Sequence, residues 1–349
     1  HGKTTTTSMV ANVLAQGGLD PTMVIGGKVN ALGSHARLGR GDLLVAEADE
    51  SDGSFLRLSP TIVAVTNLDR EHLDHYGSME RINESFLEFI NKIPFYGLAV
   101  LCADDEYLTA LLPRLVKRYH TYGIRDRGGM APDFKATDIS LKQWGAEFRT
   151  YFRGRNLGPF RLSVPGIHNV SNALAAIAIG LELEIPVDLI RKGLAAFTGV
   201  ERRFHLRGEA GGIMVVDDYG HHPTEVKATL AAARQGWEDR RLVVLFQPHR
   251  YSRTRDCIAE FAHAFYHADL LFTTEIYPAG EPPIPGISGA ALAETIKSAG
   301  HPSVTFIERK ETLPDHVLPY LRPGDLVLTL GAGDIWKAGT GILARLESA

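Results

Sequence analysis

The first residues of the chain carry most of a phosphate-binding pattern. Gly2, Lys3 and Thr4 supply the last three specified positions of G-x-x-x-x-G-K-[ST]. In such a loop the backbone amides cradle phosphates, the lysine meets the outer phosphates and the hydroxyl binds magnesium. The first glycine of the pattern and the strand that leads into it would lie before His1. The pattern is therefore either a chance match at an ordinary helix start or part of a larger protein cut within its nucleotide site.

Acidic residues follow an apolar run in LLVAEADESD, and Glu47 is the first of them. A strand beside a phosphate loop delivers a carboxylate to magnesium in this layout, and we predict that role for Glu47. The acids behind it, Asp49, Glu50 and Asp52, are better explained as a solvated loop. After the next apolar run, VTNLDREHLDHYG contains His72. Read locally, this histidine is either a second metal ligand or, more simply, a loop residue with a satisfied hydrogen bond.

Two asparagines lie at the start of a helical pattern in PGIHNVSNALAAIA. Asn169 and Asn172 are one turn apart and share a helix face, and His168 directly precedes them. Asparagine amides can bond both the donor and the acceptor edge of adenine. The alternative is N-capping of the helix by Asn169 or Ser171, and from these residues alone capping is the better account.

Charged side chains gather in three segments of the second half of the chain. They are VERRFHLRG with Arg202 and Arg203, DDYGHHPTE with Asp217, Asp218, His221 and His222, and FQPHRYSRTRD with His249, Arg250, Arg253 and Arg255. Arginine is suited to bidentate capture of carboxylate or phosphate. The last two segments follow strands of one predicted sheet, so we expect a face built for an anionic partner. No serine, cysteine and histidine arrangement indicates a covalent enzyme nucleophile.

The elements that must position these residues alternate between short apolar runs and helical patterns, which is typical of a parallel α/β sheet. TSMVANVLAQGG places four apolar residues on one helical face: Met9, Val10, Val13 and Leu14. Buried strands are predicted in DLLVAEADESD, TIVAVTNLDREHLDHYG and LAVLCADDE, and ligands of open α/β sheets lie at the carboxyl ends of such strands. From Asp133 to about Pro165 the pattern changes to antiparallel hairpins, and two helices follow in NVSNALAAIAIGLEL and VDLIRKGLAAF.

A second α/β rhythm begins near Glu201, with a strand, a polar loop and a helix that has Pro223 near its first turn. We therefore predict two domains, residues 1–200 and 201–349. The first has a mostly parallel sheet with a small antiparallel edge, and the second is doubly wound. The GAGDI segment near the end lacks the third glycine and the following acid of a dinucleotide fingerprint, so it is predicted to be a tight strand-to-helix loop.

Bulk composition agrees with two globular domains. The 349 residues are 44% hydrophobic and 22% charged, and the net charge of -4 gives no overall attraction to nucleic acid or anionic membrane. The two cysteines, Cys102 and Cys257, provide no disulfide framework, so a cytoplasmic location is expected. No apolar stretch approaches the roughly 20 residues that span a bilayer. No pattern in the sequence specifies an oligomeric state.

Together these motifs resemble those of the Mur ligases of peptidoglycan synthesis. The resemblance is carried, in the family's order, by HGKTTTT, EADESDGSF, VTNLDREHLDHYG, HNVSNALAA, ERRF, DDYGHHPTEV and QPHRYSRT. Within the family, the motif sequences are most similar to those of the members that add L-alanine to UDP-N-acetylmuramate. The resemblance implies a UDP-sugar domain, a central ATPase domain and a Rossmann-like C-terminal domain. This chain would contain the last two, so we expect an N-terminal truncation and an inactive fragment as it stands.

The resemblance also implies the chemistry. ATP and Mg²⁺ would be the cofactors, and UDP-N-acetylmuramate and L-alanine the small-molecule substrates. ATP would phosphorylate the lactyl carboxylate, and the amine of alanine would attack the acyl phosphate, which requires cations around two anions. Lys3, beside Gly2, would neutralise the β- and γ-phosphates. Thr4 and Glu47 would hold one magnesium and His72 a second.

The remaining motif residues would surround the substrates. The adenine side of ATP would meet His168, Asn169 and Asn172. The phosphates would meet Arg203, or its neighbour Arg202, and the ribose Asp218. The muramyl and alanine side would be lined by His221, His222, His249, Arg250 and Arg253. One departure concerns the carbamylated lysine of several relatives: SMERINESFLEFINK has no lysine before Lys92, so we expect no such group and a metal site completed by water or another side chain.

Three alternatives stay open at this point. Murein-peptide ligase shares the HGKTTTT opening and a similar histidine-rich loop. Folylpolyglutamate synthase shares the architecture, but its sequence motifs are not recognised in the second half of this chain. A nucleotide-binding module without ligase activity would explain the phosphate loop and Glu47, but not the arginine- and histidine-rich loops.

Overall fold

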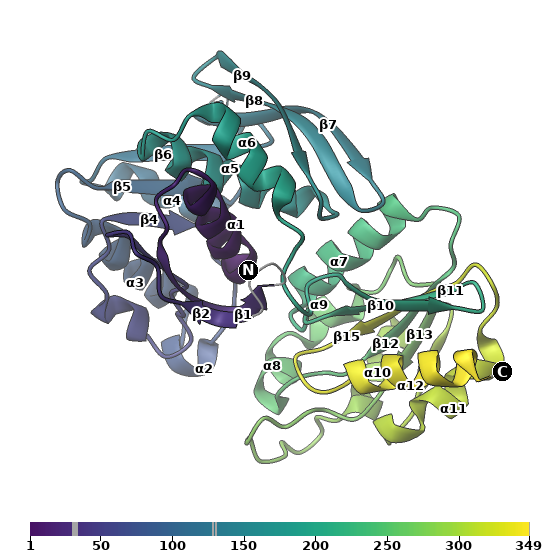
Figure 1. The fold of residues 1–349 in the computed structure, drawn as a ribbon. Helices are drawn as coiled ribbons and strands as arrows, with labels where there is room; N and C mark the ends of the chain where they lie inside the picture. The colour runs from purple at the N-terminus through teal and green to yellow at the C-terminus, as the bar shows by residue number, and fades with distance from the viewer. Residues whose placement is uncertain (30–33, 128, 130, 349) are drawn as a thin grey trace. The chain divides into compact units, whose positions relative to one another are not determined.

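The computed structural model describes residues 1–29, 34–127, 129 and 131–348. The chain divides into two compact units, His1–Glu201 and Arg202–Ala349, and each is described by itself (Figure 1). Among the described residues, no helix combines the length and the apolar character needed to cross a bilayer.

The main sheet of the first unit has six strands in the order β4-β5-β6-β7-β8-β9. These strands are β4 (Ile62–Val65), β5 (Leu98–Cys102), β6 (Tyr119–Gly123), β7 (Phe134–Lys142), β8 (Gly145–Phe152) and β9 (Arg155–Leu162). Strands β4 to β7 pair in parallel, and β7, β8 and β9 pair antiparallel. The predicted parallel sheet with an antiparallel edge is thus confirmed. Every residue of β5 is buried, because both faces of the sheet are covered.

A second, three-stranded sheet in this unit was not anticipated. It has the order β2-β1-β3 and consists of β1 (Thr22–Val29), β2 (Ser34–Arg37) and β3 (Leu44–Ala46). The prediction of a buried strand before Glu47 is wrong in one respect. Strand β3 has only three residues and Leu44 is 63% exposed, because β3 pairs with β1 in this small sheet rather than within the main one.

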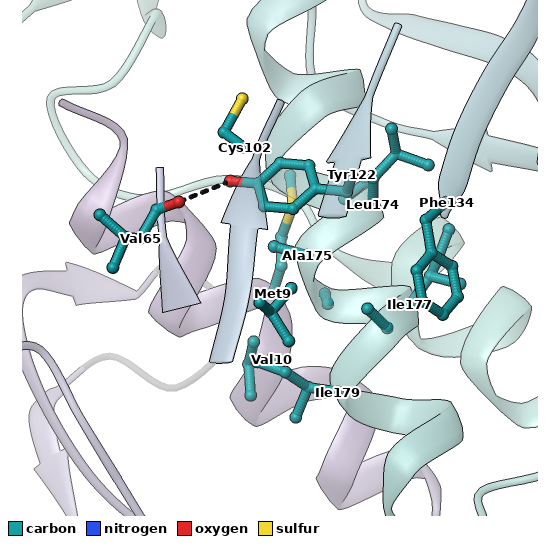
Figure 2. Packing of buried hydrophobic residues seen from close by; sticks show 14 of the residues in the cluster. Met9, Val10, Val65, Cys102, Tyr122, Phe134, Leu174, Ala175, Ile177 and Ile179 are labelled. Carbon is teal, nitrogen blue, oxygen red and sulfur yellow. Dashed lines mark hydrogen bonds between the residues drawn. The ribbon is translucent and has the colours of Figure 1, made fainter. Parts of the chain in front are cut away.

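Helices pack on the sheets of the first unit. They are α1 (Lys3–Gln16), α2 (Leu73–Tyr76), α3 (Met79–Asn91), α4 (Glu106–Leu111), α5 (Ile167–Glu182) and α6 (Val187–Ala196), with short 3₁₀ turns η1 (Ser54–Arg57) and η2 (Leu112–Arg114). The predicted apolar face of α1 is confirmed, since Met9 and Val13 have no exposed surface. Figure 2 shows Met9 and Val10 among side chains of α5, and the buried Tyr122 of β6, whose hydroxyl donates to the Val65 carbonyl oxygen at 3.4 Å. The core therefore joins the apolar face of α1 to α5 and to the sheet.

The sheet of the second unit has the order β10-β11-β15-β12-β13-β14. Its strands are β10 (His205–Ala210), β11 (Ile213–Asp218), β12 (Leu242–Phe246), β13 (Leu270–Thr273), β14 (Val304–Phe306) and β15 (Leu326–Leu330). All neighbours pair in parallel except β10, which runs antiparallel to β11 and was not anticipated. Parallel strands end at one edge of the sheet, so the loops that follow β11, β12, β13 and β15 share that edge.

Helices cover both faces of this second sheet. They are α7 (Pro223–Gly236), α8 (Tyr251–Asp256), α9 (Ile258–Ala262), α10 (Gly289–Ser298), α11 (Leu313–Val317) and α12 (Trp336–Glu347), with turns η3 (Lys310–Thr312) and η4 (Leu318–Tyr320). Alternate strand residues enter two separate apolar clusters: Val216 and Val244 pack with α7, α9 and α10, whereas Val215 and Val243 pack with α11 and α12. The predicted doubly wound arrangement is confirmed.

Candidate active site

The phosphate-loop residues lie at the start of α1. Gly2 is the N-cap residue, with φ of 80°, a backbone conformation that favours glycine. A Cβ atom on residue 2 would also come within 2.8 Å of the Asn172 Oδ1 atom. The Thr66 hydroxyl and the Asn67 amide, just past β4, both donate to the His1 carbonyl oxygen, at 2.6 and 2.8 Å. The backbone before α1 is thus held by the segment that follows β4, with the helix N-terminus available to an anion.

Thr4 and Glu47 are brought together as the sequence analysis expected. The Thr4 hydroxyl donates to Glu47 Oε1 at 2.8 Å, and the Gly26 amide donates to Glu47 Oε2 at 2.7 Å. The backbone amide of Glu47 also donates to the Val24 carbonyl oxygen at 2.9 Å, which continues the β1–β3 pairing. Strand β3 therefore delivers this carboxylate to the first turn of α1.

Lys3 contacts an acid that the sequence analysis assigned to solvent. Its Nζ atom lies 2.5 Å from Glu50 Oε2 and 3.4 Å from Asp49 Oδ1. The expectation of a solvated side chain is wrong for Glu50, which is only 15% exposed, whereas Asp49 is 63% exposed. Burial acts to lower the pKa of Lys3, but the neighbouring carboxylates, Glu50 foremost, outweigh it and raise that pKa above its ordinary value. Lys3 is therefore a permanent cation at the helix start.

His72 lies beside the same glutamate. It is the N-cap residue of α2, with φ of 56°, a strained conformation for a side chain of this size. Its Nε2 atom is 3.9 Å from Glu50 Oε1, and one ligand atom from each of Glu50, Glu71 and His72 lies within 4.8 Å of the others. The Tyr76 hydroxyl donates to the Glu50 carbonyl oxygen at 2.5 Å, which holds this loop against α2. Glu71 and Glu50 are the site residues that the motifs alone did not reveal.

The two asparagines of α5 share a face, but they do not cap the helix. Gly166 is the N-cap residue of α5, without a side-chain capping bond, so the local capping alternative is wrong. Asn169 Nδ2 donates to the Pro165 carbonyl oxygen at 2.6 Å, and Asn172 Nδ2 donates to Asn169 Oδ1 at 3.2 Å. Asn172 lies beside Gly2 of the phosphate loop, because a Cβ atom on residue 2 would come within 2.8 Å of its Oδ1 atom. His168 is exposed in the first turn of α5, and contact of these residues with adenine stays a prediction.

Arg202 and Arg203 have different surroundings in the second unit. Arg202 Nε donates to Asp217 Oδ2 at 3.1 Å and Arg202 Nη2 donates to the Gly331 carbonyl oxygen at 2.7 Å. Arg203 Nη1 lies 3.7 Å from Glu225 Oε1. Both guanidinium groups stack on the Tyr219 ring, at 4.9 and 5.2 Å from its centroid. Arg202 therefore anchors the sheet edge, which leaves Arg203 as the better candidate for a ligand phosphate.

Asp218 is buried and is used by its own unit. It accepts the Phe204 and Gly220 amides at 2.7 Å each, and the Thr229 hydroxyl at 3.2 Å. Burial raises the pKa of Asp218, although the Arg203 guanidinium and the backbone donors act in the opposite direction. The predicted ribose contact stays a prediction, and the observed role of this carboxylate is to hold the loop after β11.

His221 and His249 form the centre of a cluster at the strand ends. Their rings are 5.4 Å apart, and His249 also stacks on Tyr277. His221 Nδ1 lies 2.9 Å from the Tyr219 carbonyl oxygen and 3.3 Å from Glu225 Oε2, so Nδ1 carries a proton. The loops after β11, β12 and β13 thus meet at one edge, as the parallel order predicts.

The contacts of His249 indicate a neutral imidazole ring and identify which of its nitrogens carries the proton. Burial lowers its pKa to about 3, and the neighbouring His221 and the arginines of the same loop act in the same direction. Arg253 Nη1 donates to His249 Nδ1 at 3.1 Å, so the ring proton lies on Nε2. Arg250 has φ of 69°, another strained residue among the predicted site residues. The cluster offers an N–H donor and two guanidinium groups, which is chemistry suited to a carboxylate.

His222 caps a helix, and its predicted place on the substrate side stays a prediction. It is 3% exposed and is the N-cap residue of α7, where its Nδ1 atom accepts the Thr224 amide and the Glu225 side chain completes the capping box. Its Nε2 atom lies 3.6 Å from the buried Cys257 sulfur. The motif HHP therefore contributes one histidine to the cluster and one to the helix start.

A phosphate loop with a carboxylate beside its threonine, and a doubly wound unit with guanidinium groups at its strand ends, define an α/β enzyme that handles phosphate and carboxylate groups. Residues 1–180 match the family model of the Mur ligase middle domain, and residues 202–333 match that of the Mur ligase, glutamate ligase domain. The chain belongs to the Mur ligase family.

Two curated relatives show what the chain is similar to. The chain is 57% identical to UDP-N-acetylmuramate–L-alanine ligase of Geobacter sulfurreducens, over all of this chain and 75% of that protein. It is 54% identical to the enzyme of the same name from Sorangium cellulosum, over all of this chain and 74% of that protein.

Solved structures agree in fold. The structure of UDP-N-acetylmuramate-alanine ligase from Thermotoga maritima has a TM-score of 0.82 and 30% identity, covering all of this chain and 74% of that one. A murein peptide ligase from Psychrobacter arcticus has a TM-score of 0.72 and 25% identity, covering all of this chain and 76% of that one.

Proposed function

We propose that this protein joins L-alanine to the lactyl carboxylate of UDP-N-acetylmuramate, with ATP converted to ADP and phosphate. The observation that carries the proposal is the arrangement of Lys3, Thr4 and Glu47 around the start of α1. The chain that contains them is 57% identical to a relative named UDP-N-acetylmuramate–L-alanine ligase. In the reaction, a carboxylate oxygen attacks the γ-phosphorus and ADP leaves. The amine of alanine then attacks the carbonyl carbon, and phosphate leaves as the amide forms.

The residues of the first unit supply cations and donors for the phosphate transfer. Lys3 would lie along the β- and γ-phosphates, where its fixed charge balances the charge that develops during transfer. The N-terminal amides of α1 would donate to the same oxygens. Asn169, Asn172 and His168 would contribute on the nucleotide side, as the family resemblance implies.

Mg²⁺ fits the oxygen-rich surroundings of α1. Thr4 and Glu47, which contact each other, offer the hard oxygen ligands that this ion prefers, and bound Mg²⁺ would neutralise phosphate charge. The ligand atoms of Glu50, Glu71 and His72 lie within 4.8 Å of one another, and carboxylate oxygens are ligands that Mg²⁺ prefers. We propose that the two glutamates complete the His72 site, in the place that a carbamylated lysine has in several relatives.

The second unit supplies recognition of carboxylate and amine. Arg203 would reach a phosphate, while His249 and Arg253 would bind the carboxylate of alanine through Nε2–H and the guanidinium group. Arg250 and His221 belong to the same cluster and would line the same side. A cytoplasmic location is part of this proposal, because the nucleotide substrates are cytoplasmic metabolites.

Phosphate release by the protein encoded by the whole gene tests the proposal. With ATP and Mg²⁺ present, we expect release only when both UDP-N-acetylmuramate and L-alanine are added. If L-alanyl-γ-D-glutamyl-meso-diaminopimelate replaced alanine as the preferred amine, the protein would be a murein-peptide ligase. If release ignored both substrates, a nucleotide-binding module would be the better account.

A further inference from the structure

We propose that Tyr277, in the loop after β13, is a positioning residue that sets the ring plane of His249 for the amino-acid substrate. We further infer that Gly333 of the GAGDI loop is a glycine so that the Tyr277 ring has room. This inference rests on the proposed function, which places the carboxylate of alanine beside His249.

The backbone holds the two rings in register. The strand pairing of β12 with β13 continues beyond both strands, because the Tyr277 amide donates to the Pro248 carbonyl oxygen at 2.8 Å and the Arg250 amide donates to the Tyr277 carbonyl oxygen at 2.9 Å. His249 and Tyr277 form an isolated parallel bridge. Side chains of such bridge partners project from the same face, so the stack is built by the sheet edge itself.

The ring geometry is that of a parallel stack. The centroids of His249 and Tyr277 are 5.5 Å apart and their planes differ by only 7°. Rotation of an imidazole about its second side-chain torsion is broad when nothing restrains it. The phenol ring on one side and the Arg253 bond to Nδ1 together restrict that rotation, and they determine where the Nε2–H donor points.

Gly333 lies against the Tyr277 ring. A Cβ atom on residue 333 would come within 2.8 Å of Tyr277 Cδ2 and 2.4 Å of Gln247 Oε1. Gly333 does not have a positive φ, so its backbone would accept alanine without strain. The contact with Tyr277 and Gln247, rather than a special φ, therefore explains a glycine at this position. These contacts explain one glycine of the GAGDI segment, which does not match a dinucleotide fingerprint.

The effect of Tyr277 should appear in the binding of L-alanine, because His249 is the group that Tyr277 positions. An aromatic stack contributes about 0.5–1.5 kcal/mol, so we expect Tyr277→Leu to raise the KM for L-alanine up to roughly tenfold. The kcat and the KM values for ATP and UDP-N-acetylmuramate should stay within about twofold, because Tyr277 acts through His249, which the proposed function assigns to the amino acid. Tyr277→Phe keeps the ring and should restore the wild-type KM.

The test is steady-state kinetics of phosphate release on the whole gene product, with Tyr277→Leu, Tyr277→Phe, Gly333→Ala and the Tyr277→Leu/Gly333→Ala double variant. Tyr266→Leu is the matched control, since Tyr266 also contacts a histidine ring, His267, but is 87% exposed. We expect Gly333→Ala to raise the KM for alanine and to add less in the Tyr277→Leu background than in wild type, because part of its effect acts through the Tyr277 ring and part through Gln247.

The outcomes separate this inference from the proposed function. If wild type releases phosphate only with both substrates but Tyr277→Leu has an unchanged KM for alanine, the positioning role is wrong. It is also wrong if the two single effects multiply fully in the double variant, or if all three KM values rise together. Should the leucine variant not fold, Gly333→Ala against Tyr277→Phe decides the same question. Absence of substrate-dependent release in wild type would instead remove the proposed function.

Discussion

Replacing Lys3 with methionine is expected to lower kcat for phosphate release by about 10²–10³-fold. Methionine keeps the length and helix propensity of the side chain but removes the cation that lies 2.5 Å from Glu50 at the start of α1. Phosphoryl transfer depends on positioning and on cations around the transferring group, with little covalent work for the protein. The loss should therefore appear in kcat and in kcat/KM for ATP.

Lys192→Met is the matched control for this change, since Lys192 is an exposed residue of α6 in the same unit. Its rate should equal wild type. A Lys3→Met protein that is folded, by its thermal transition, and retains activity within a few fold of wild type would place the nucleotide phosphates away from α1.

Asp217→Ala is expected to lower the free energy of unfolding by about 3–5 kcal/mol. The Asp217 side chain has no exposed surface and accepts the Thr329 hydroxyl at 2.7 Å and Arg202 Nε at 3.1 Å. Removing the carboxylate leaves a guanidinium group that is only 22% exposed without its ionic partner. Urea denaturation monitored by tryptophan fluorescence measures the change, and amide hydrogen exchange should localise it to β11 and β15.

Asp315→Ala provides the comparison on the surface of the same unit. Asp315 also pairs with an arginine, Arg345, at 3.0 Å, but its side chain is 63% exposed. A pair of this kind contributes no more than about 1 kcal/mol. Equal losses for the two variants would mean that Asp217 is not the anchor of the strand edge described above.

The fold was largely predictable where burial is periodic in the sequence. The one-sided pattern of Met9 and Val13 in α1, and the apolar runs of β5 and β12, correspond to elements with a buried core face. Strands β1 and β10 were missed because glycines interrupt them and their residues have mixed polarity. The apolar residues of β3 predicted a buried strand. Their exposure depends on which sheet the strand joins, and the local sequence does not specify that.

The candidate site was predictable only where a motif names its residues. Lys3, Thr4 and Glu47 come from a spacing rule that has a physical basis, and the structure brings them together. Glu50 was assigned to solvent because nothing local distinguishes it from Asp49, and its contact with Lys3 spans 47 positions of the chain. Tyr277 was missed for a similar reason, since strand pairing alone places it beside His249.

The adjacent residues Arg202 and Arg203 also could not be distinguished from the local sequence. Arg202 and Arg203 are equivalent in the sequence, so either one was expected to reach the phosphates. In the structure the Arg202 side chain contacts Asp217 and the Gly331 carbonyl oxygen, whereas Arg203 lies beside Glu225. These contacts separate the anchoring residue from its neighbour, and they join segments that are distant in the sequence.

Transfer of carboxylate oxygen into phosphate tests the central claim most directly. The whole gene product would be incubated with ATP, Mg²⁺, L-alanine and UDP-N-acetylmuramate labelled with ¹⁸O in its lactyl carboxylate, and the released phosphate analysed by mass spectrometry. The account predicts that each phosphate formed carries one ¹⁸O atom, because the oxygen that attacks the γ-phosphorus leaves with it when the amine attacks. Unlabelled phosphate, or label recovered in AMP, would contradict an acyl phosphate and with it the reaction proposed for this protein.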